Sequence, residues 1–597
     1  MNNKNVIILT LSLLFSATTF SQHDHIRFQP ITMDFEINST SETASENPFT
    51  DYRLNVTFTN KNKQYKVPGF YAADGNAANT SANSGGLWRV IFTPPHPGKW
   101  TYHVSFKKGK NIAIKEDPYI GLPVDNHHGK TGSFTVKETP DEAESFEHSG
   151  TVIYNNSRYL YTQNGEPLLI FGTNSPENFL AYKDIDNTYA IDSGSNYIKS
   201  WKPHIKDWKE GDPTWKNGKG KGIIGALNYL ASKKMNAIYF LTLNIDGDAK
   251  DVWPFISHKR KDFKRYDVSK LAQWDIIFSH AEKLGIVIEI VTQEQENQLL
   301  LDDGYTLSER KLYYRELIAR FSYHKNIIWN IGEENGYAGS WPHGQNDQQR
   351  YSMIRYIKEN DPYNHPVLMH TYPYEEEREA IASPLLKFDK FNGLSMQVGE
   401  PNNAYYDIKK WVEKSEEQNP WIILMDEIGP WHTGTQPDNL NPDHYMERTT
   451  VLWPSLMAGA AGVQWYFGWF TSPHDLNAED LRSRNNMWEQ TAYAKAFFKN
   501  INYTEMSSSN HLISKGENYC FSKTGETYVV YLKYGGTTKL DLSQVKGEYT
   551  IQWFNPRQGG EFRKGTIETL KSGGWVNIGF APEDKFKDWV VLIRRDR

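Results

Sequence analysis

Hydrophobic and polar residues follow two different patterns along the chain, and the change between them divides it into three regions. In residues 23–145, short apolar runs with period-two alternation are separated by turns rich in Asn, Gly and Pro, and residues 505–597 return to this pattern. Such alternation is typical of antiparallel β-sandwiches. The predicted strands are Tyr52–Phe58, Leu87–Phe92, Trp100–Phe106 and Gly132–Lys137 in the first region, and Tyr528–Tyr534, Tyr549–Phe554, Gly574–Gly579 and Asp588–Ile593 in the last.

Between these regions, residues 151–500 alternate apolar strands with helical stretches, which predicts parallel β/α units. The eight predicted strands are Pro167–Gly172, Ala237–Leu243, Val287–Thr292, Ile327–Ile331, Pro366–His370, Gly393–Gln397, Trp421–Met425 and Gly462–Phe467. The helical stretches between them include Ile223–Lys234, Val268–Leu284, Glu309–His324 and Gln348–Asn360. Eight such units indicate a (β/α)8 barrel, whose active site lies at the carboxyl ends of the strands.

The predicted fold class is therefore α/β plus all-β, with a central (β/α)8 barrel between an N-terminal and a C-terminal antiparallel β-sandwich. We place a signal peptide at residues 1–21, the first sandwich at 22–145, the barrel at 146–503 and the second sandwich at 504–597. The acidic, turn-rich stretch 138–150 is a candidate linker between the first two domains.

The N-terminus has the pattern of a secretory signal. Lys4 supplies the positive charge, Val6–Ala17 is apolar, and Thr19 and Ser21 are small residues before a cleavage site after Ser21. A membrane anchor is the alternative, but the apolar run is too short to span a bilayer and lacks basic flanks after it. Cys520 is the single cysteine, which leaves neither a disulfide nor a lipid anchor near the cut. We therefore predict a secreted or periplasmic bacterial protein.

Composition and motifs exclude several function classes. The 66 basic and 72 acidic residues give a net charge of −6, so the basic footprint of a nucleic-acid binder is missing. Gly220, Gly222 and Gly225 fit G-x-G-x-x-G, but the preceding residues 201–219 are polar and do not form the buried strand that a dinucleotide site requires. Residues 244–251 (NIDGDAKD) resemble a calcium loop without its sixth-position glycine and terminal Glu. We predict no cofactor and no metal.

Acidic residues end the fourth and seventh predicted strands. The segment 327–336 (IIWNIGEENG) contains Glu333 and Glu334, and the segment 420–431 (PWIILMDEIGPW) contains Asp426 and Glu427. On a barrel these strand ends share the catalytic face. Retaining glycoside hydrolysis needs two such carboxyl groups, one protonated to release the leaving oxygen and one ionised to attack the anomeric carbon. The alternative is a set of salt bridges at the rim.

These strand ends resemble those of the glycoside hydrolase clan A barrels, which carry the acid/base Glu after strand 4 and the nucleophile Glu after strand 7. The resemblance implies that Glu334 is the acid/base and Glu427 the nucleophile. This sequence differs from the clan pattern at Glu333, where the clan usually has an Asn that binds the sugar 2-hydroxyl. Either Glu333 replaces that contact, or Glu333 itself is the acid.

The flanking regions extend the resemblance over essentially the whole mature chain. Residues 67–102 (VPGFYAADGNAANTSANSGGLWRVIFTPPHPGKWTY) resemble the sandwich called DUF5060, which precedes such barrels. The segment 172–182 (GTNSPENFLAY) resembles the barrel start of the same proteins. The segment 553–560 (WFNPRQGG) resembles their C-terminal "putative collagen-binding" domain, and we predict no collagen binding from that name.

Further polar and aromatic residues near strand ends are candidate sugar contacts, because amides and carboxylates bind hydroxyls and aromatic rings stack on CH faces. They are Glu333, Asn174, Glu177, Asn244, Gln293, His370, Tyr372, Gln397, Trp465 and Trp469. The resemblance implies that Trp465 or Trp469 forms the floor of the subsite that holds the cleaved sugar. Tyr372 is a candidate hydrogen-bond donor to the nucleophile. The alternative is core packing for either tryptophan and a structural imidazole for His370.

The insertion 183–222 carries seven lysines between Lys199 and Lys221, together with Trp201, Trp208 and Trp215. With the segment 259–265 (KRKDFKR) it forms either a solvated loop or a basic, aromatic wall that contacts an anionic, sulfated or uronic polysaccharide.

The sequence thus predicts a glycosidase that cleaves O-glycosidic bonds of a polysaccharide or oligosaccharide by a retaining double displacement. The expected partner is this saccharide, with no nucleic acid and no membrane anchor. The alternative is a non-catalytic carbohydrate-binding or adhesive surface protein with a silent barrel. The sugar, the linkage, endo or exo action and the oligomeric state stay open.

Overall fold

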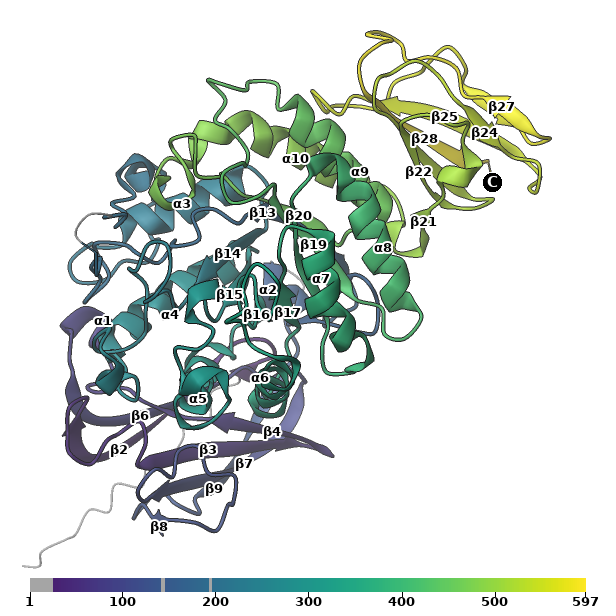
Figure 1. Ribbon diagram of the computed structural model, residues 1–597. Coiled ribbons are helices and arrows are strands. Elements are labelled where there is room, and N and C mark those ends of the chain that lie inside the picture. The colour runs from purple at the N-terminus through teal and green to yellow at the C-terminus, as the bar shows by residue number, and fades with distance from the viewer. Residues whose placement is uncertain (1–24, 141–144, 193–195, 597) are drawn as a thin grey trace, which may run out of the picture.

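The structure is a computed structural model, and it describes residues 25–140, 145–192 and 196–596. The predicted signal peptide, residues 1–21, lies outside this range. Figure 1 shows strands at the N-terminal end in purple, a central barrel with its helices in teal and green, and a C-terminal group of strands in yellow. No helix among the described residues is long and apolar enough to cross a membrane.

The N-terminal region is built from two sheets, as the alternating pattern predicts. One has the order β1(His25–Ile26)-β9(Thr131–Lys137)-β7(Gly98–Lys108)-β3(Tyr52–Asn60)-β4(Lys63–Pro68), with β8(Leu122–Pro123) paired to β7. The other has the order β2(Ile31–Ser41)-β6(Ser84–Phe92)-β5(Phe70–Tyr71). All pairs are antiparallel except β1 with β9. Strand β2 alternates buried and exposed residues over its first half, because only one of its faces meets the core.

The centre is a closed barrel of eight parallel strands, so the predicted β/α architecture is confirmed. Its strands are β13(Ile170–Thr173), β14(Ala237–Leu241), β15(Val287–Val291), β16(Ile327–Asn330), β17(Val367–His370), β18(Gly393–Val398), β19(Ile422–Ile428) and β20(Gly462–Trp465). The surrounding helices are α3(Lys221–Ser232), α4(Val268–Lys283), α5(Ser308–Phe321), α6(Asp347–Asn360), α7(Glu375–Ala382), α8(Ala404–Glu416), α9(Trp453–Ala458) and α10(Asn485–Phe498). Every residue of the eight strands is buried, which is why they read as continuous apolar runs in the sequence.

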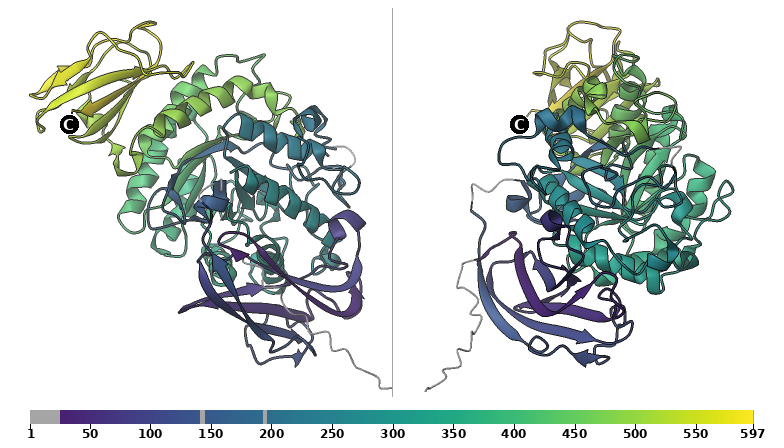
Figure 2. Two further views of the ribbon diagram at one scale, coloured as in Figure 1. Left: turned by 180° about the vertical axis from the view of Figure 1, so that it is seen from behind. Right: turned by 90° about the vertical axis from the view of Figure 1, so that its left-hand side faces the viewer.

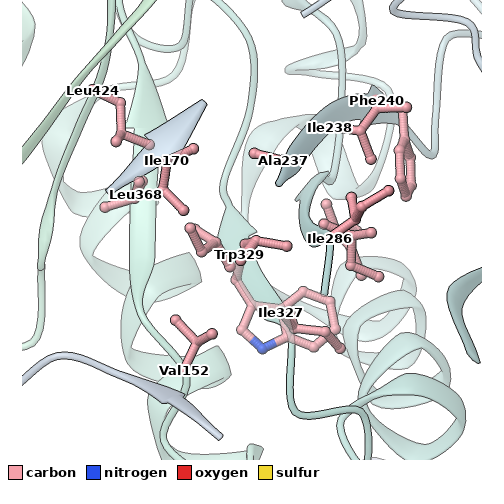
Figure 3. Close-up of a cluster of buried hydrophobic side chains, with 14 of the residues drawn as sticks. Val152, Ile170, Ala237, Ile238, Phe240, Ile286, Ile327, Trp329, Leu368 and Leu424 are labelled. Carbon is pink, nitrogen blue, oxygen red and sulfur yellow. The ribbon is translucent and has the colours of Figure 1, made fainter. Parts of the chain in front are cut away.

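Apolar side chains from several barrel strands pack together in the core. In Figure 3, Ile170, Ala237, Ile327, Leu368 and Leu424 come from five different barrel strands and gather in one buried cluster. The short hairpin strands β10(Val152–Ile153), β11(Leu160–Thr162) and β12(Pro167–Leu168) precede the barrel.

The C-terminal region also has two sheets. Their orders are β21(Ser507–Ser508)-β22(Asn518–Lys523)-β23(Thr527–Leu532)-β28(Trp589–Arg595)-β25(Glu548–Phe554)-β26(Thr569–Lys571) and β24(Lys539–Asp541)-β27(Trp575–Asn577). Alternate residues of the large sheet join different cores. Tyr528 and Val530 pack within the domain, whereas Val529 and Tyr531 join the core of the barrel, where Tyr531 stacks on Trp453 at a ring distance of 5.6 Å.

The two sandwiches lie on opposite sides of the barrel (Figure 2), and buried polar contacts fix both of them to it. On the N-terminal side, the Val268 amide at the start of α4 donates to Glu42 Oε1 at 2.8 Å. On the C-terminal side, the Arg448 guanidinium binds Asp588 through Nε at 2.8 Å and Nη2 at 3.1 Å. Arg448 and Asp588 are both buried, so this pair is part of the interface core rather than a surface ion pair.

The glycine motif at the start of α3 has a packing role. A Cβ atom on Gly225 would lie 1.9 Å from the carbonyl oxygen of His204, and one on Gly222 would lie 2.7 Å from Cβ of Trp201. These glycines let α3 approach the insertion segment closely, which agrees with the rejection of a dinucleotide site.

Candidate active site

A cavity of about 670 Å³ opens at the carboxyl ends of the barrel strands. Eight carboxylate side chains line it, and neither a lysine nor an arginine is among its described lining residues. The acidic residues are Glu177, Asp248, Glu294, Glu296, Glu333, Glu334, Glu377 and Glu427. The aromatic lining consists of Trp341, Tyr372, Tyr374, Trp431, His432, Tyr466 and Trp469. The combination of carboxylates and aromatic rings suits a saccharide, as the sequence predicts.

Strand β19 carries Glu427 into this cavity and continues further than predicted, to Ile428. Its pairing with β18 shifts at Met396/Gln397, so that Met425 faces Met396 and Glu427 faces Gln397. The bulge leaves Asp426 without a partner across the ladder. The new register also places the Gln397 amide against the Glu427 carboxylate, where Nε2 donates to Oε1 at 2.6 Å.

Strand β16 ends at Asn330, and the loop after it carries Glu333 and Glu334. The amide of Glu333 donates to the Gln293 carbonyl at 2.9 Å, and its Oε1 accepts a hydrogen bond from Tyr239 at 3.0 Å. Glu334 has a φ of 38°, a left-handed conformation that is costly for a side chain other than glycine. Its carboxylate accepts a hydrogen bond from Gln295 at 2.7 Å and is half-buried at the cavity wall.

His370 lies between the carboxylates of the two strands. Its Nδ1 is 3.7 Å from Glu333 Oε1, and its Nε2 is 3.5 Å from Glu427 Oε2. One carboxylate oxygen of Glu333 lies within 4.8 Å of one of Glu427. Burial lowers the pKa of His370 to about 3, so the imidazole between the two carboxyl groups is neutral.

The site favours protonated carboxyl groups. Burial, and after it the charges of Glu333 and Glu334, raise the pKa of Glu427 well above its usual value. Burial and the charge of Glu296 raise the pKa of Glu334 to about 8. Burial and the charge of Glu334 raise the pKa of Glu333. The cavity therefore holds more acidic groups than it can ionise together without a compensating cation.

A polar network supports Glu427 from inside the barrel. Asp426 accepts hydrogen bonds from the Ser395 hydroxyl and, at 3.1 Å, from Gln464 Nε2. Gln464 also donates to Glu289 at 3.0 Å, and Asn330 donates to the same carboxylate at 2.8 Å. Asp426 is thus tied into the barrel interior, whereas the neighbouring Glu427 faces the cavity.

Comparisons with known proteins agree with this architecture. Residues 25–107 match the family model described as "Domain of unknown function (DUF5060)", and residues 508–594 match "Putative collagen-binding domain of a collagenase". A crystal structure of a "putative glycoside hydrolase" from Bacteroides vulgatus ATCC 8482 is similar over 96% of this chain and 100% of its own, with 13% identity and a TM-score of 0.63.

A glycoside hydrolase family 5 structure from the same organism matches 76% of this chain and 94% of its own, with 16% identity and a TM-score of 0.53. The chain has a glycoside hydrolase fold. At these identities the likeness describes the fold and not the reaction. No curated protein matches the sequence.

Several residues predicted to contact sugar lie outside the cavity lining, where they support the walls of this glycoside hydrolase fold. Asn174 Nδ2 donates to the Asp426 carbonyl at 3.1 Å, and Asn244 binds its own loop at Asp251 and Val252. Gln293 accepts from Arg310 and donates to Gln345 at 2.7 Å. All three are fully buried and lie outside the cavity lining.

Tyr372 does line the cavity, but its hydroxyl donates to the Gly336 carbonyl at 2.9 Å and not to Glu427. Gln397, which the sequence offered only as a sugar contact, donates to Glu427 instead. Glu177 lines the cavity as predicted.

The two candidate tryptophans occupy different environments. Trp465 is fully buried in β20 and donates from Nε1 to Thr491 at 2.9 Å, so it belongs to the core and lies outside the cavity lining. Trp469 lines the cavity, with its ring 4.6 Å from that of His474. The alternative of core packing is therefore correct for Trp465 only.

Of the two arrangements predicted for the lysine-rich insertion, the basic wall of the cavity is not formed. Lys199 is buried and donates to Asn178 at 2.7 Å, Lys216 pairs with Asp186, and Lys221 lies 4.0 Å from the Trp208 ring centre. Trp201 and Trp215 are buried in the core.

The sequence interpretation missed much of the cavity lining. Glu294, Gln295 and Glu296 follow strand β15, and Asp248 lies in the loop after β14. Their position in the loops after predicted strands could have identified them as candidates for the cavity lining. Trp341, Trp431 and Tyr466 also line the cavity, the first two from long loops whose course the pattern does not specify.

Proposed function

We propose that this protein hydrolyses O-glycosidic bonds of a polysaccharide or oligosaccharide with retention of configuration, using Glu427 as nucleophile and Glu334 as acid/base. The observation that carries the proposal is the meeting of carboxylates from strands β16 and β19 at one cavity. Gln397 donates to Glu427 at 2.6 Å, and Gln295 donates to Glu334 at 2.7 Å, so a side-chain amide orients each carboxyl group.

Protonated Glu334 no longer adds the negative charge that opposes ionisation of Glu427. In the first step, the Glu427 carboxylate attacks the anomeric carbon while Glu334 gives its proton to the departing glycosidic oxygen. The products are a glycosyl ester on Glu427 and a free leaving group. In the second step, Glu334 removes a proton from water, whose oxygen attacks the anomeric carbon and releases Glu427. The overall reaction adds one water across the glycosidic bond and needs no cofactor.

Glu333 is the rival for the acid role, because its oxygen lies within 4.8 Å of Glu427 and retaining enzymes hold their carboxyl groups about 5–5.5 Å apart. Two observations favour Glu334. Glu333 is 7% exposed and takes hydrogen bonds from Tyr239, whereas Glu334 stands half-buried at the cavity wall. Glu333 then occupies the place of the Asn that binds the sugar 2-hydroxyl in clan A.

The charge of the cavity bears on the substrate. Eight carboxylates without a lysine or arginine among the described lining residues repel sulfate and uronate groups, so we propose a neutral sugar next to Glu427 rather than an anionic one. Trp469 supports the stacking of a sugar ring. Export through the predicted signal peptide stays part of the proposal.

The test is a panel of neutral and anionic polysaccharides with analysis of released products. Wild-type protein is expected to release oligosaccharides or monosaccharides, and Glu427→Gln is expected to lose turnover by orders of magnitude while still binding the same glycan. Binding by the wild type without product from any glycan would support the alternative, an adhesive protein with a silent barrel.

The two acid candidates are separated by leaving-group dependence. If Glu334 is the acid, Glu334→Gln loses about 10²–10⁴-fold with the natural substrate and much less with an aryl glycoside whose leaving group needs no proton. Glu333→Gln would then impair both substrates alike. The reverse pattern would move the acid role to Glu333.

A further inference from the structure

A second group of acidic residues lies beside the proposed nucleophile. Glu177, Glu294 and Glu333 come from three different segments, and each places a carboxylate oxygen within 4.8 Å of the other two. The exposed fractions of the three side chains are only 7%, 4% and 7%. Three buried carboxylates this close repel one another unless a positive charge or shared protons compensate them.

The hydrogen bonds of the group leave part of it without a partner. Glu333 Oε1 accepts from Tyr239, and Glu294 Oε1 accepts from the Asp248 amide at 2.8 Å. Glu177 Oε1 and Glu294 Oε2 are buried and make no hydrogen bond. Buried polar atoms are rarely left unpaired in native proteins, so these two oxygens indicate a missing partner.

The chemistry of the missing partner follows from the donor set. All three groups are carboxylates, which are the ligands of hard cations such as Ca²⁺ and Mg²⁺. Ca²⁺ binds oxygen at about 2.3–2.6 Å and can bridge oxygens up to about 5.2 Å apart, whereas Mg²⁺ at about 2.0–2.1 Å reaches only about 4.2 Å. The three oxygens lie within 4.8 Å of one another, inside the span that Ca²⁺ can bridge.

We propose that Glu177, Glu294 and Glu333 bind a calcium ion in the wall of the cavity. Asp248 and Glu296 line the same cavity and add negative charge around the ion. Three carboxylates leave further positions on a cation that takes six to eight oxygens. The loop 244–251, which by itself lacks the pattern of a calcium loop, contributes here through Asp248, whose amide orients Glu294.

Glu333 belongs to the proposed calcium site and also lies within 4.8 Å of Glu427. The ion is therefore next to the sugar that Glu427 would attack. Its open positions suit a pair of neighbouring sugar hydroxyls, which are neutral oxygen ligands. This use of the ion rests on the proposed function, whereas the binding of the ion does not, so the two can fail separately.

Binding is measured on the full chain after treatment with a chelator and without any saccharide. Ca²⁺ is expected to raise the melting temperature of the wild type, and Tb³⁺ is expected to luminesce on excitation of the cavity tryptophans and to be displaced by Ca²⁺. Glu177→Gln and Glu294→Gln should weaken both effects at least about tenfold in ion concentration. Glu377→Gln removes a carboxylate from the same cavity outside the group and should leave ion binding unchanged.

A second test needs no measurement of affinity, because it compares only which protein is more stable with and without Ca²⁺. In chelator, Glu294→Gln should be at least as stable as the wild type, because it removes one of the mutually repelling carboxylates; in Ca²⁺ the order should reverse. A wild type that gains no stability from Ca²⁺ and shows no Tb³⁺ signal overturns the proposal, as does equal loss of binding in Glu377→Gln. If Ca²⁺ binds but leaves KM for a hydrolysed glycan unchanged, the ion has no role with substrate.

Discussion

Glu42 offers a quantitative test of how the N-terminal sandwich is attached to the barrel. Its side chain is 8% exposed, and it accepts a hydrogen bond from the Val268 amide at 2.8 Å. Burial and the charge of Asp267 raise the pKa of Glu42 from 4.5 to about 8. Because the folded pKa lies above the unfolded one, folding favours the protonated group, and stability falls as the pH rises from about 4.5 to about 8.

The Glu42→Gln substitution keeps an oxygen that can accept from Val268 and removes the ionisable group. At 1.36 kcal/mol for each pKa unit, the ionised carboxylate costs about 4 kcal/mol at pH 8 and almost nothing at pH 4. With an unfolding entropy of about 2.1 cal/mol/K per residue, this corresponds to a rise in melting temperature of about 3 °C at pH 8.

Differential scanning calorimetry of wild type and Glu42→Gln between pH 4 and pH 8 measures this difference. The melting temperature of the variant relative to that of the wild type should rise steadily as the pH rises. Glu36→Gln, an exposed position in the same domain, controls for the general loss of one negative charge. Equal melting temperatures of wild type and Glu42→Gln at pH 8, or a variant that is less stable there, would refute the reasoning.

Two further predictions concern the C-terminal domain and the cavity. Asp588→Asn breaks the buried pair with Arg448 and should cost about 3–5 kcal/mol, seen as an earlier thermal transition; an unchanged transition would mean that the pair does not hold the domain. Trp469→Ala should raise KM for a hydrolysed glycan at constant melting temperature, whereas Trp465→Ala should cost about 3–5 kcal/mol of stability. Similar KM increases in both variants, without loss of stability, would contradict the placement of the two rings.

The barrel could be predicted from sequence because a parallel sheet covered by helices on its outer face requires apolar residues at consecutive positions. The eight predicted strands therefore coincide with β13 to β20 to within a few residues. The extension of β19 was not predicted, because Asp426 and Glu427 are typical of a strand end. In the structure a bulge at Asp426 lets the pairing resume at Glu427.

The candidate site could be predicted only in part from the sequence. Glu334 and Glu427 were found because each follows an apolar strand, and the structure brings them to one cavity. The sequence could not distinguish Trp465 from Trp469, since both lie in one aromatic segment. Only the packing of α10 shows that Thr491 accepts a hydrogen bond from the indole N–H of Trp465. Glu289 was missed because a single acid within a buried strand gives no periodic signal.

The central claim is that Glu427 forms a covalent bond to the sugar. Once the glycan panel names the released sugar, the wild type is incubated with its 2-deoxy-2-fluoro glycoside bearing a good leaving group, which slows the second step. Mass spectrometry should find one glycosyl adduct on the peptide that contains Glu427. An adduct on another residue, or a product of inverted configuration with no adduct, would contradict the account.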